Sequence, residues 1–367
     1  MINNANFNVK TAKRPTLETS KVYEATKDAQ YSHHPYLCRF HGRFIALFSS
    51  GAVHEDDAGQ RAVLAYSDDF KTWTKPKALE VTGRKNSVDT ACGLFVDGDT
   101  LYVYVGTYFY DKTHTQENGG RVFEDKGHED TRLYVLTSKD GVHFSSPTDT
   151  GLKMVPNMTP KRMKNGEVVV CGNFLLPVNK NFSNNPNAWE ICGLDTKQIV
   201  DDSESFYAVS EGLGIETVVC EADIFEKDDG TYISLFRSQK KGFFGLLYAS
   251  TSKDLRSWSL PERTAFSNDT SKFSVGRLKD GRFFYIGNAL VGGGRNPLVL
   301  SLSADGENFT EHFVLGEDKP PIRYRGFAKG GTYGYPYAFE DDGFVYAIYS
   351  INKEDVGACR VKISELV

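Results

Sequence analysis

Long hydrophobic runs are missing from this sequence, and no stretch of it is strongly basic. No apolar run reaches the roughly 18 residues that a membrane-spanning helix needs. The net charge is −5, and lysine and arginine do not gather into the stripe that marks a nucleic-acid-binding face. The sequence therefore predicts a globular protein whose partner is neither a membrane nor a nucleic acid.

Cysteine pairs are missing as well. The six cysteines are spread singly along the chain, and no two of them form a C-x-x-C pair. We therefore expect no zinc or iron–sulfur centre. No other metal motif is visible, so we expect no cofactor and no metal beyond an incidental calcium ion at loop carboxylates. Cys171 and Cys220 lie in apolar, strand-like segments, which favours buried free thiols and agrees with a reducing compartment.

A recognisable export signal is the third absence. The N-terminal residues, MINNANFNVKTAKRP, contain no apolar segment of the kind found in secretory signals. We expect a cytoplasmic protein, or a periplasmic or secreted one whose signal has already been removed.

Glycine and aromatic residues, by contrast, are abundant. The chain has 34 glycines, and 13% of its residues are Phe, Trp or Tyr. Aromatic residues favour strands and glycine favours turns, while no segment has the periodicity of a long amphipathic helix. Together with a hydrophobic content of 40%, this composition predicts an all-β protein with a large core.

A seven-residue pattern, S-x-D-x-x-x-W/F, recurs four times and each time follows a strand-like segment. The aspartate is placed to accept hydrogen bonds from backbone N–H groups of a turn, and the final aromatic residue folds back into the core. Where glycine follows the aspartate, it accepts a left-handed backbone conformation. The four copies are residues 67–73, 138–144, 252–258 and 303–309.

A second turn pattern alternates with the first. Six glycines follow Asp, Asn or His between apolar segments, which is the strongest short-range signal for a β-hairpin. The six pairs are His41-Gly42, Asp97-Gly98, Asn165-Gly166, Asp229-Gly230, Asp280-Gly281 and Asp342-Gly343. One such hairpin for every ~50 residues predicts a closed six-bladed β-propeller.

The six blades are expected over similar lengths of chain. Their predicted ranges are 31–80, 88–150, 151–212, 218–262, 270–318 and 330–367. We expect residues 1–367 to form one propeller domain, in which residues 1–30 add a strand to the last blade and close the ring. Residues 111–130 are polar and contain glycine, which predicts a long rim loop over the centre.

The repeated turns resemble the sialidase (neuraminidase) superfamily, whose Asp boxes have this pattern. In that family the Asp boxes lie on the outside of the ring and mark the fold more than the activity. As architecture the resemblance covers nearly the whole chain. It implies a carbohydrate-processing site at the centre of the propeller.

Further segments resemble the catalytic landmarks of that family and occur in the same order. The resemblance implies that Glu221 activates a tyrosine nucleophile, for which Tyr335 is the best match. It also implies that Arg237 and Arg295 bind a carboxylate of the substrate. Asp56 aligns best with the acid/base aspartate, which protonates the leaving oxygen.

Neighbouring residues are secondary candidates. Asp57 is the next match for the acid/base residue, and Arg61 in the same segment is a candidate for substrate binding. Tyr333 and Tyr337 alternate with Tyr335 and compete with it as the nucleophile. The alternative for all three tyrosines is the packed core face of one strand.

One position departs from the family pattern. Sialidases begin their first blade with Arg-Ile-Pro, where this chain has His33-His34-Pro35, so His34 replaces an arginine of the carboxylate-binding triad. The loss of one bidentate guanidinium predicts weak activity on sialic acid itself. His33 is a further candidate for substrate binding.

The predicted function is a sialidase-like exo-glycoside hydrolase that acts on an acidic sugar of a glycan. A glutamate beside a tyrosine can take the phenolic proton as the attack begins, and a neutral phenol tolerates an anionic substrate. His34 beside a tyrosine and arginines also suits a polysaccharide lyase, or a His-dependent glycosidase, acting on uronic acids. A non-catalytic carbohydrate-binding propeller is the remaining alternative.

Overall fold

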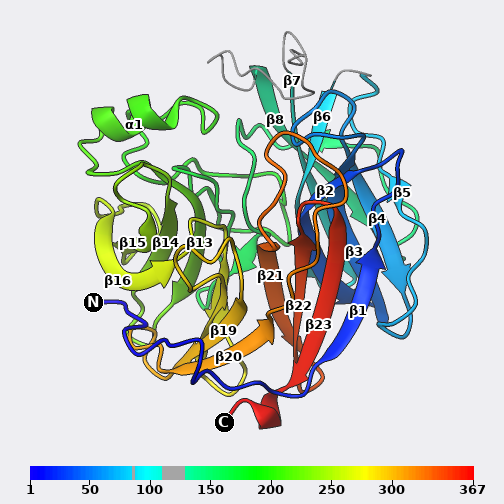
Figure 1. Ribbon diagram of the computed structural model, residues 1–367. Coiled ribbons are helices and arrows are strands. Elements are labelled where there is room, and N and C mark those ends of the chain that lie inside the picture. The colour runs from blue at the N-terminus through cyan, green and yellow to red at the C-terminus, as the bar shows by residue number, and fades with distance from the viewer. Residues whose placement is uncertain (85–86, 110–128) are drawn as a thin grey trace.

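Apolar strands separated by glycine turns form six antiparallel sheets around a central axis in the computed structural model of the protein (Figure 1). The structure describes residues 1–84, 87–109 and 129–367. The six-bladed propeller predicted from the repeats is thereby confirmed, with blade limits close to the expected ones. Most of the predicted rim loop, residues 111–130, lies outside the described residues.

In each blade the strands follow one another from the axis outward. The first blade contains β2 (Tyr31–Phe40), β3 (Arg43–Gly51), β4 (Arg61–Ser67) and β5 (Lys77–Ala78). The second contains β6 (Ser87–Asp97), β7 (Thr100–Phe109), β8 (Glu129–Ser138) and β9 (Thr148–Asp149). The third contains β10 (Lys161–Arg162), β11 (Val168–Val169) and β12 (Val178–Asn179).

The other three blades have four strands each. The fourth contains β13 (Val219–Glu226), β14 (Tyr232–Ser238), β15 (Gly245–Ser252) and β16 (Glu262–Asn268). The fifth contains β17 (Ser274–Arg277), β18 (Phe283–Gly287), β19 (Leu298–Ser303) and β20 (Glu311–Gly316). The sixth contains β21 (Tyr333–Asp341), β22 (Phe344–Ile351), β23 (Asp355–Lys362) and, from the other end of the chain, β1 (Glu18–Tyr23).

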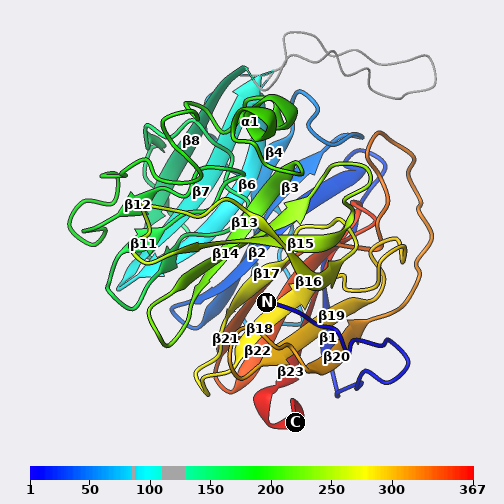
Figure 2. The same ribbon diagram turned by 90° about the vertical axis from the view of Figure 1, so that its left-hand side faces the viewer.

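The two ends of the chain meet in the sixth blade. β1 pairs antiparallel with β23, with Ser20 opposite Ala358, and the two strands lie side by side in both views (Figures 1 and 2). A 3₁₀ turn, η1 (Ile363–Glu365), follows β23. Because the first and last segments share one sheet, the ring is held closed by backbone hydrogen bonds.

The third blade is the least regular. Its three strands have two residues each, and isolated bridges, such as that between Val178 and Glu190, extend the pairing. Residues 151–212 contain Pro156, Pro160, Pro177 and Pro186, which lack the N–H group that a β-ladder needs. This blade also carries α1 (Phe206–Gly212), a helix that the sequence did not predict. Among the described residues, no helix has the length and apolarity to span a bilayer.

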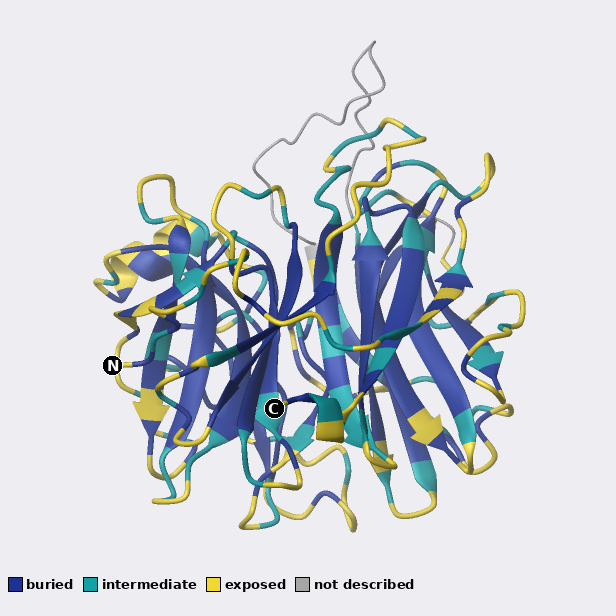
Figure 3. Ribbon diagram, turned by 60° about the horizontal axis from the view of Figure 1, so that its bottom comes forward, coloured by how far each residue is buried: buried dark blue, intermediate teal, exposed yellow. Residues whose placement is uncertain are grey.

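The core consists of apolar layers between neighbouring sheets. Phe44 and Phe70 of the first blade pack on Tyr346 of the sixth, with ring centroids 5.3 Å from Tyr346 in both cases. Phe225 of the fourth blade packs on Phe283 of the fifth at 5.3 Å. Burial is therefore concentrated in the strands, and the exposed residues lie mainly in the loops at the two ends (Figure 3).

The four Asp boxes have the turn geometry predicted from the sequence. The Asp254 carboxylate accepts hydrogen bonds from the backbone N–H groups of Arg256 at 2.8 Å and Ser257 at 2.7 Å. Asp69 accepts the equivalent pair of hydrogen bonds. Asp140 and Asp305 repeat the arrangement. Hydrogen bonds within the turn lower the pKa of all four carboxyl groups, first that of the His143 side chain at Asp140, and against the effect of burial at Asp305. The residue after the aspartate adopts a left-handed backbone conformation even where it is not glycine, with φ of 65° at both Phe70 and Leu255.

Removing one Asp box aspartate should destabilise the fold without changing it. We expect Asp254→Ala to lower the free energy of unfolding by about 1 kcal/mol, because two turn N–H groups lose their acceptor as in a lost helix cap. Asp254→Asn keeps one acceptor oxygen and should lose less. Urea denaturation measures both, and an Asp254→Ala protein as stable as the parent would contradict the structural role of the box.

Candidate active site

The innermost strands of three blades share one irregularity close to where they begin. The pairing register shifts in β2, β13 and β21, so each strand has a bulge. The bulges lie at His34, Glu221 and Tyr335, whose φ angles are 53°, 52° and 52°. A residue with a left-handed backbone conformation at a bulge turns its side chain away from the face that regular strand alternation would give it. Pro35 directly follows His34, and Pro336 directly follows Tyr335. At a bulge the missing N–H group of proline removes no hydrogen bond from the sheet.

The re-aimed side chains of two blades meet in a hydrogen-bonded triad. The Tyr335 hydroxyl donates to Glu221 Oε1, and Arg237 Nη1 donates to the Tyr335 hydroxyl at 3.2 Å. Arg237 Nη1 also lies 2.8 Å from Glu221 Oε2. The exposed fractions of Glu221, Arg237 and Tyr335 are 7%, 7% and 8%. Burial, followed by the charge of Glu221, raises the pKa of Tyr335 well above its ordinary value.

Arg295 reaches the same tyrosine from the fifth blade. Its guanidinium carbon lies 5.5 Å from the centre of the Tyr335 ring. Asp269 accepts the backbone N–H of Arg295 at 2.7 Å and so fixes the turn that carries it. A Cβ atom on Gly331 would lie 2.7 Å from Arg295 Cδ, so this glycine leaves room for the side chain. Among the described residues, Arg295 Nη1 is buried without a hydrogen-bond acceptor.

Both histidines of the first blade pack against Tyr335. The ring centroids of His33 and His34 lie 4.0 and 5.3 Å from that of Tyr335. His33 Nδ1 lies 2.6 Å from the hydroxyl of Ser350, and His34 Nδ1 lies 3.1 Å from that of Ser49. Burial and then nearby cations, Lys353 among them, lower the pKa of both imidazoles well below the ordinary value. Both rings are therefore neutral at pH 7.

The acidic loop between β3 and β4 brings a carboxylate that the sequence analysis did not single out, that of Glu55, to the histidines. Glu55 lies nearest the histidines, with Oε1 3.9 Å from His33 Nε2, and its Oε2 accepts a hydrogen bond from Lys353 at 2.5 Å. Asp56 has a left-handed φ of 58° and accepts a hydrogen bond from the Tyr108 hydroxyl. Glu55 and Asp56 both raise the pKa of the buried Tyr31 beside them, after burial itself.

Two other candidates from the same segment have different surroundings. Asp57 is half-buried, and in the described part of the chain no contact joins its side chain to the histidines or to Tyr335. Arg61 donates to the backbone oxygens of Gln60 at 2.8 Å and of Ser87 at 3.1 Å. It also lies 3.8 Å from Asp89. These bonds tie the base of the loop to the second blade.

The alternating tyrosines of β21 do not share one face. Tyr333 packs inside the sixth blade, with its ring 5.3 Å from that of Tyr349, and Tyr337 packs against Tyr36 at 5.6 Å. Only Tyr335 of the three contacts Glu221. The bulge between Gly334 and Tyr337 causes this separation, because it breaks the two-residue period of the strand.

Two buried lysines were missed in the sequence. Lys272 is 1% exposed, donates to the Tyr36 hydroxyl at 3.1 Å and lies 5.4 Å from the centre of the Tyr335 ring. Burial lowers the pKa of Lys272 to about 8, against the opposing charges of Glu221 and Asp223. Lys353 is 6% exposed. A single lysine at a strand start or in a turn is ordinary in sequence, so no local signal marked either residue.

The centre of the ring is consequently rich in positive charge. Arg237 is compensated by Glu221 and Lys353 by Glu55, whereas Arg295 and Lys272 have no carboxylate within ion-pair distance among the described residues. Cations that lack such partners in a buried site favour an anionic ligand.

A separate cavity of about 660 Å³ lies at the opposite end of the axis. It is lined by the C-terminal parts of the innermost strands, including Arg39, Arg277 and Glu340. Several of its cations are already paired, for example Arg39 with Asp341 at 3.0 Å and Arg277 with Asp228. None of Glu221, Arg237 and Tyr335 lines it, so the triad lies outside this cavity.

Comparison with known proteins agrees with this architecture. The fold defines the class of the protein as a sialidase-like β-propeller. The chain belongs to the BNR repeat-like domain family, which matches residues 121–347. No curated protein matches the chain.

Solved structures match almost the whole chain at low identity. A protein of unknown function from Dyadobacter fermentans is 16% identical with a TM-score of 0.65, over 95% of this chain and 99% of that one. Trypanosoma rangeli sialidase is 14% identical with a TM-score of 0.62, over 98% and 59%. The NanB sialidase from Streptococcus pneumoniae is 12% identical with a TM-score of 0.62, over 94% and 71%. Identities this low establish the shared fold alone.

The neutral histidines should make stability depend on pH. An unfolded histidine binds a proton below about pH 6.5, whereas the buried imidazoles resist protonation. The unfolded state then binds more protons, so the free energy of unfolding should fall as the pH drops from about 6.5 to about 5. We expect His34→Gln to reduce this slope by at most about 1.4 kcal/mol per pH unit. Urea denaturation at several pH values tests this, and an unchanged slope would contradict it.

Proposed function

We propose that the protein is a sialidase-like exo-glycoside hydrolase that cleaves an acidic sugar from a glycan. The observation that carries this proposal is the contact between the Tyr335 hydroxyl, Glu221 and Arg237. A tyrosine is a poor nucleophile at neutral pH, and a carboxylate that already accepts its proton is what activation requires. The raised pKa of Tyr335 makes such a base necessary.

In the proposed reaction, Tyr335 attacks the anomeric carbon while Glu221 takes the phenolic proton. Arg237 donates to both groups and compensates the charge that moves between them. Arg295, with Nη1 lacking an acceptor in the described residues, binds the carboxylate of the sugar. Asp56, hydrogen-bonded to Tyr108, protonates the leaving oxygen.

The choice of an acidic substrate rests on the excess of positive charge at the centre. Arg295 and Lys272 both lie within 5.5 Å of the centre of the Tyr335 ring. A sugar carboxylate would compensate them, and an uncharged phenol does not repel it. The solved Trypanosoma rangeli sialidase has been described in complex with sialic acid, which is consistent with an acidic sugar as a ligand of this fold.

A second candidate is a lyase, or a His-dependent glycosidase, acting on uronic acids. The observation that favours it is the neutral ring of His34, 5.3 Å from that of Tyr335. An unprotonated imidazole is able to act as the base in β-elimination, while arginines neutralise the neighbouring carboxylate. A lyase forms an unsaturated uronate that absorbs in the ultraviolet, whereas a hydrolase releases a saturated sugar.

Substitutions of the triad test the hydrolase. Tyr335→Phe and Glu221→Gln should each lower kcat/KM by about 10²–10⁴-fold, since the nucleophile or its base is lost. Release of free acidic sugar from glycans ending in sialic or uronic acids measures turnover. The matched control is Tyr333→Phe, on the same strand but packed against Tyr349, which should retain activity. Near-normal rates in both triad variants would overturn the mechanism, and retained binding without turnover in the parent would indicate a lectin.

The same assay tests substrate preference. Because His34 stands where the sialidase pattern has an arginine, sialyl conjugates should be cleaved weakly compared with other acidic sugars. Rates are compared across the panel at equal substrate concentration. Robust and selective cleavage of sialyl conjugates would contradict this expectation, and growth of ultraviolet absorbance without free sugar would favour the lyase.

A further inference from the structure

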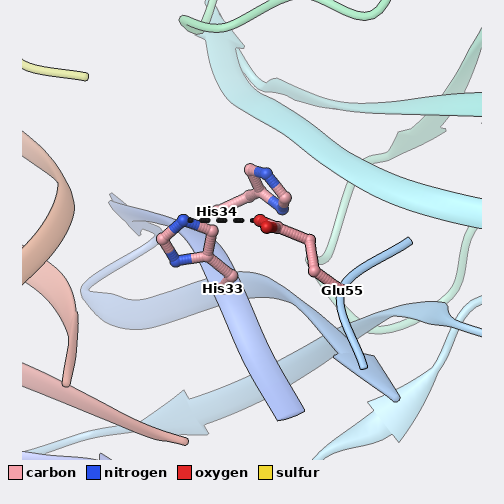
Figure 4. A group of neighbouring side chains, drawn as sticks. All are labelled: His33, His34 and Glu55. Carbon is pink, nitrogen blue, oxygen red and sulfur yellow. Dashed lines mark ion pairs between the residues drawn. The ribbon is translucent and has the colours of Figure 1, made fainter. Parts of the chain in front are cut away.

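The side chains of His33, His34 and Glu55 form a compact cluster beside Tyr335. One ligand atom from each, two ring nitrogens and a carboxylate oxygen, all lie within 4.8 Å of one another. Figure 4 shows both imidazoles next to the Glu55 carboxylate. We propose that these three residues bind a divalent transition-metal ion, with Zn²⁺ as the best match.

The hydrogen bonds around His33 determine which of its nitrogens is available. The Ser350 hydroxyl donates its proton to the Gly334 carbonyl at 3.3 Å, so it accepts the 2.6 Å hydrogen bond from His33 Nδ1–H. This assignment leaves a lone pair on His33 Nε2. That nitrogen faces Glu55 Oε1 at 3.9 Å, belongs to a side chain that is 0% exposed, and has no hydrogen-bond donor among the described residues.

The Glu55 carboxylate that faces His33 Nε2 is already held, by Lys353 at Oε2 and by the Tyr31 hydroxyl 3.4 Å from Oε1, whereas no donor among the described residues satisfies the buried His33 Nε2. A metal ion would satisfy this nitrogen and share the carboxylate, because zinc binds neutral imidazole and carboxylate ligands. Ligands at about 2.1 Å from a tetrahedral zinc ion stand roughly 3.4 Å apart, so a small movement of the side chains closes the site.

The surroundings have the features of a metal site. Ser350 and Ser49 hold the Nδ1 atoms of the two histidines, and Lys353 holds Oε2 of Glu55, so each of the three side chains is oriented by a second residue. Three protein ligands leave one position for water or substrate, as in catalytic zinc sites. Nitrogen donors disfavour Mg²⁺ and Ca²⁺, which prefer oxygen ligands.

The neighbouring cations set the strength of binding. Lys353 contacts Glu55 directly, and Lys272 and Arg295 lie over the adjacent Tyr335 ring. Their repulsion weakens the site, so we expect an exchangeable ion and not a tightly held structural one.

Equilibrium dialysis of the chelator-treated, full-length protein against Zn²⁺ tests the proposal. We expect one ion per chain, and visible absorption bands when Co²⁺ replaces Zn²⁺. His34→Ala and Glu55→Gln should each weaken binding at least about tenfold. The matched control is His143→Ala, which removes an exposed histidine of an Asp box. Mg²⁺ and Ca²⁺ should not compete.

Circular dichroism verifies that each variant is folded, and having two ligand variants keeps the test valid if one of them misfolds. Absence of stoichiometric binding would overturn the proposal. So would equal affinities of the parent, His34→Ala and Glu55→Gln. Because the assay reads binding in the absence of substrate, its outcome does not depend on the proposed hydrolase activity.

Discussion

The candidate site depends on one backbone constraint, the left-handed bulge near the start of three innermost strands. His34, Glu221 and Tyr335 all have φ near 52°, a conformation that costs a non-glycine residue of the order of 1–3 kcal/mol. The hairpins behind them, closed by regular pairing, hold the strain in place. Without the bulges, the strands would keep their two-residue alternation, and Tyr335 would share a face with Tyr333 and Tyr337.

Charge compensation is the second constraint on this centre. Burying a charge is costly unless a partner or a ligand satisfies it. Glu221 forms an ion pair with Arg237, and Glu55 forms one with Lys353. Among the described residues, Arg295 and Lys272 have no carboxylate within ion-pair distance. The proposed acidic sugar and the proposed metal ion address different atoms of the same centre. The sugar carboxylate would compensate Arg295 and Lys272, and the metal ion would bind the unsatisfied His33 Nε2 together with the Glu55 carboxylate.

Much of the fold could be predicted from local chemistry. The Asp boxes and x-Gly hairpins are short turns, whose hydrogen bonds lie within a few residues, so their spacing was enough to give six blades. The irregular third blade and α1 were not foreseen, because short strands near prolines and a seven-residue helix carry weak patterns. In the site, family resemblance led to Glu221, Arg237, Arg295 and Tyr335, which meet. In the acidic loop it pointed to Asp56 and then to Asp57, and it did not single out Glu55, which lies closest to the histidines.

The sequence by itself determined the class of fold and the turn geometry, since both follow from repeated local patterns of apolar residues, glycine and aspartate. Only the tertiary structure decided which side chains share the centre. Lys272, Lys353 and Glu55 come from three different blades or loops, and their contacts depend on the closure of the ring and on the bulges. His33 and His34 have no metal-binding spacing in the sequence, because Glu55, the third residue of the cluster, lies about twenty residues further on, in the loop between β3 and β4. Contacts of this kind are set by packing between sheets, which no local pattern encodes.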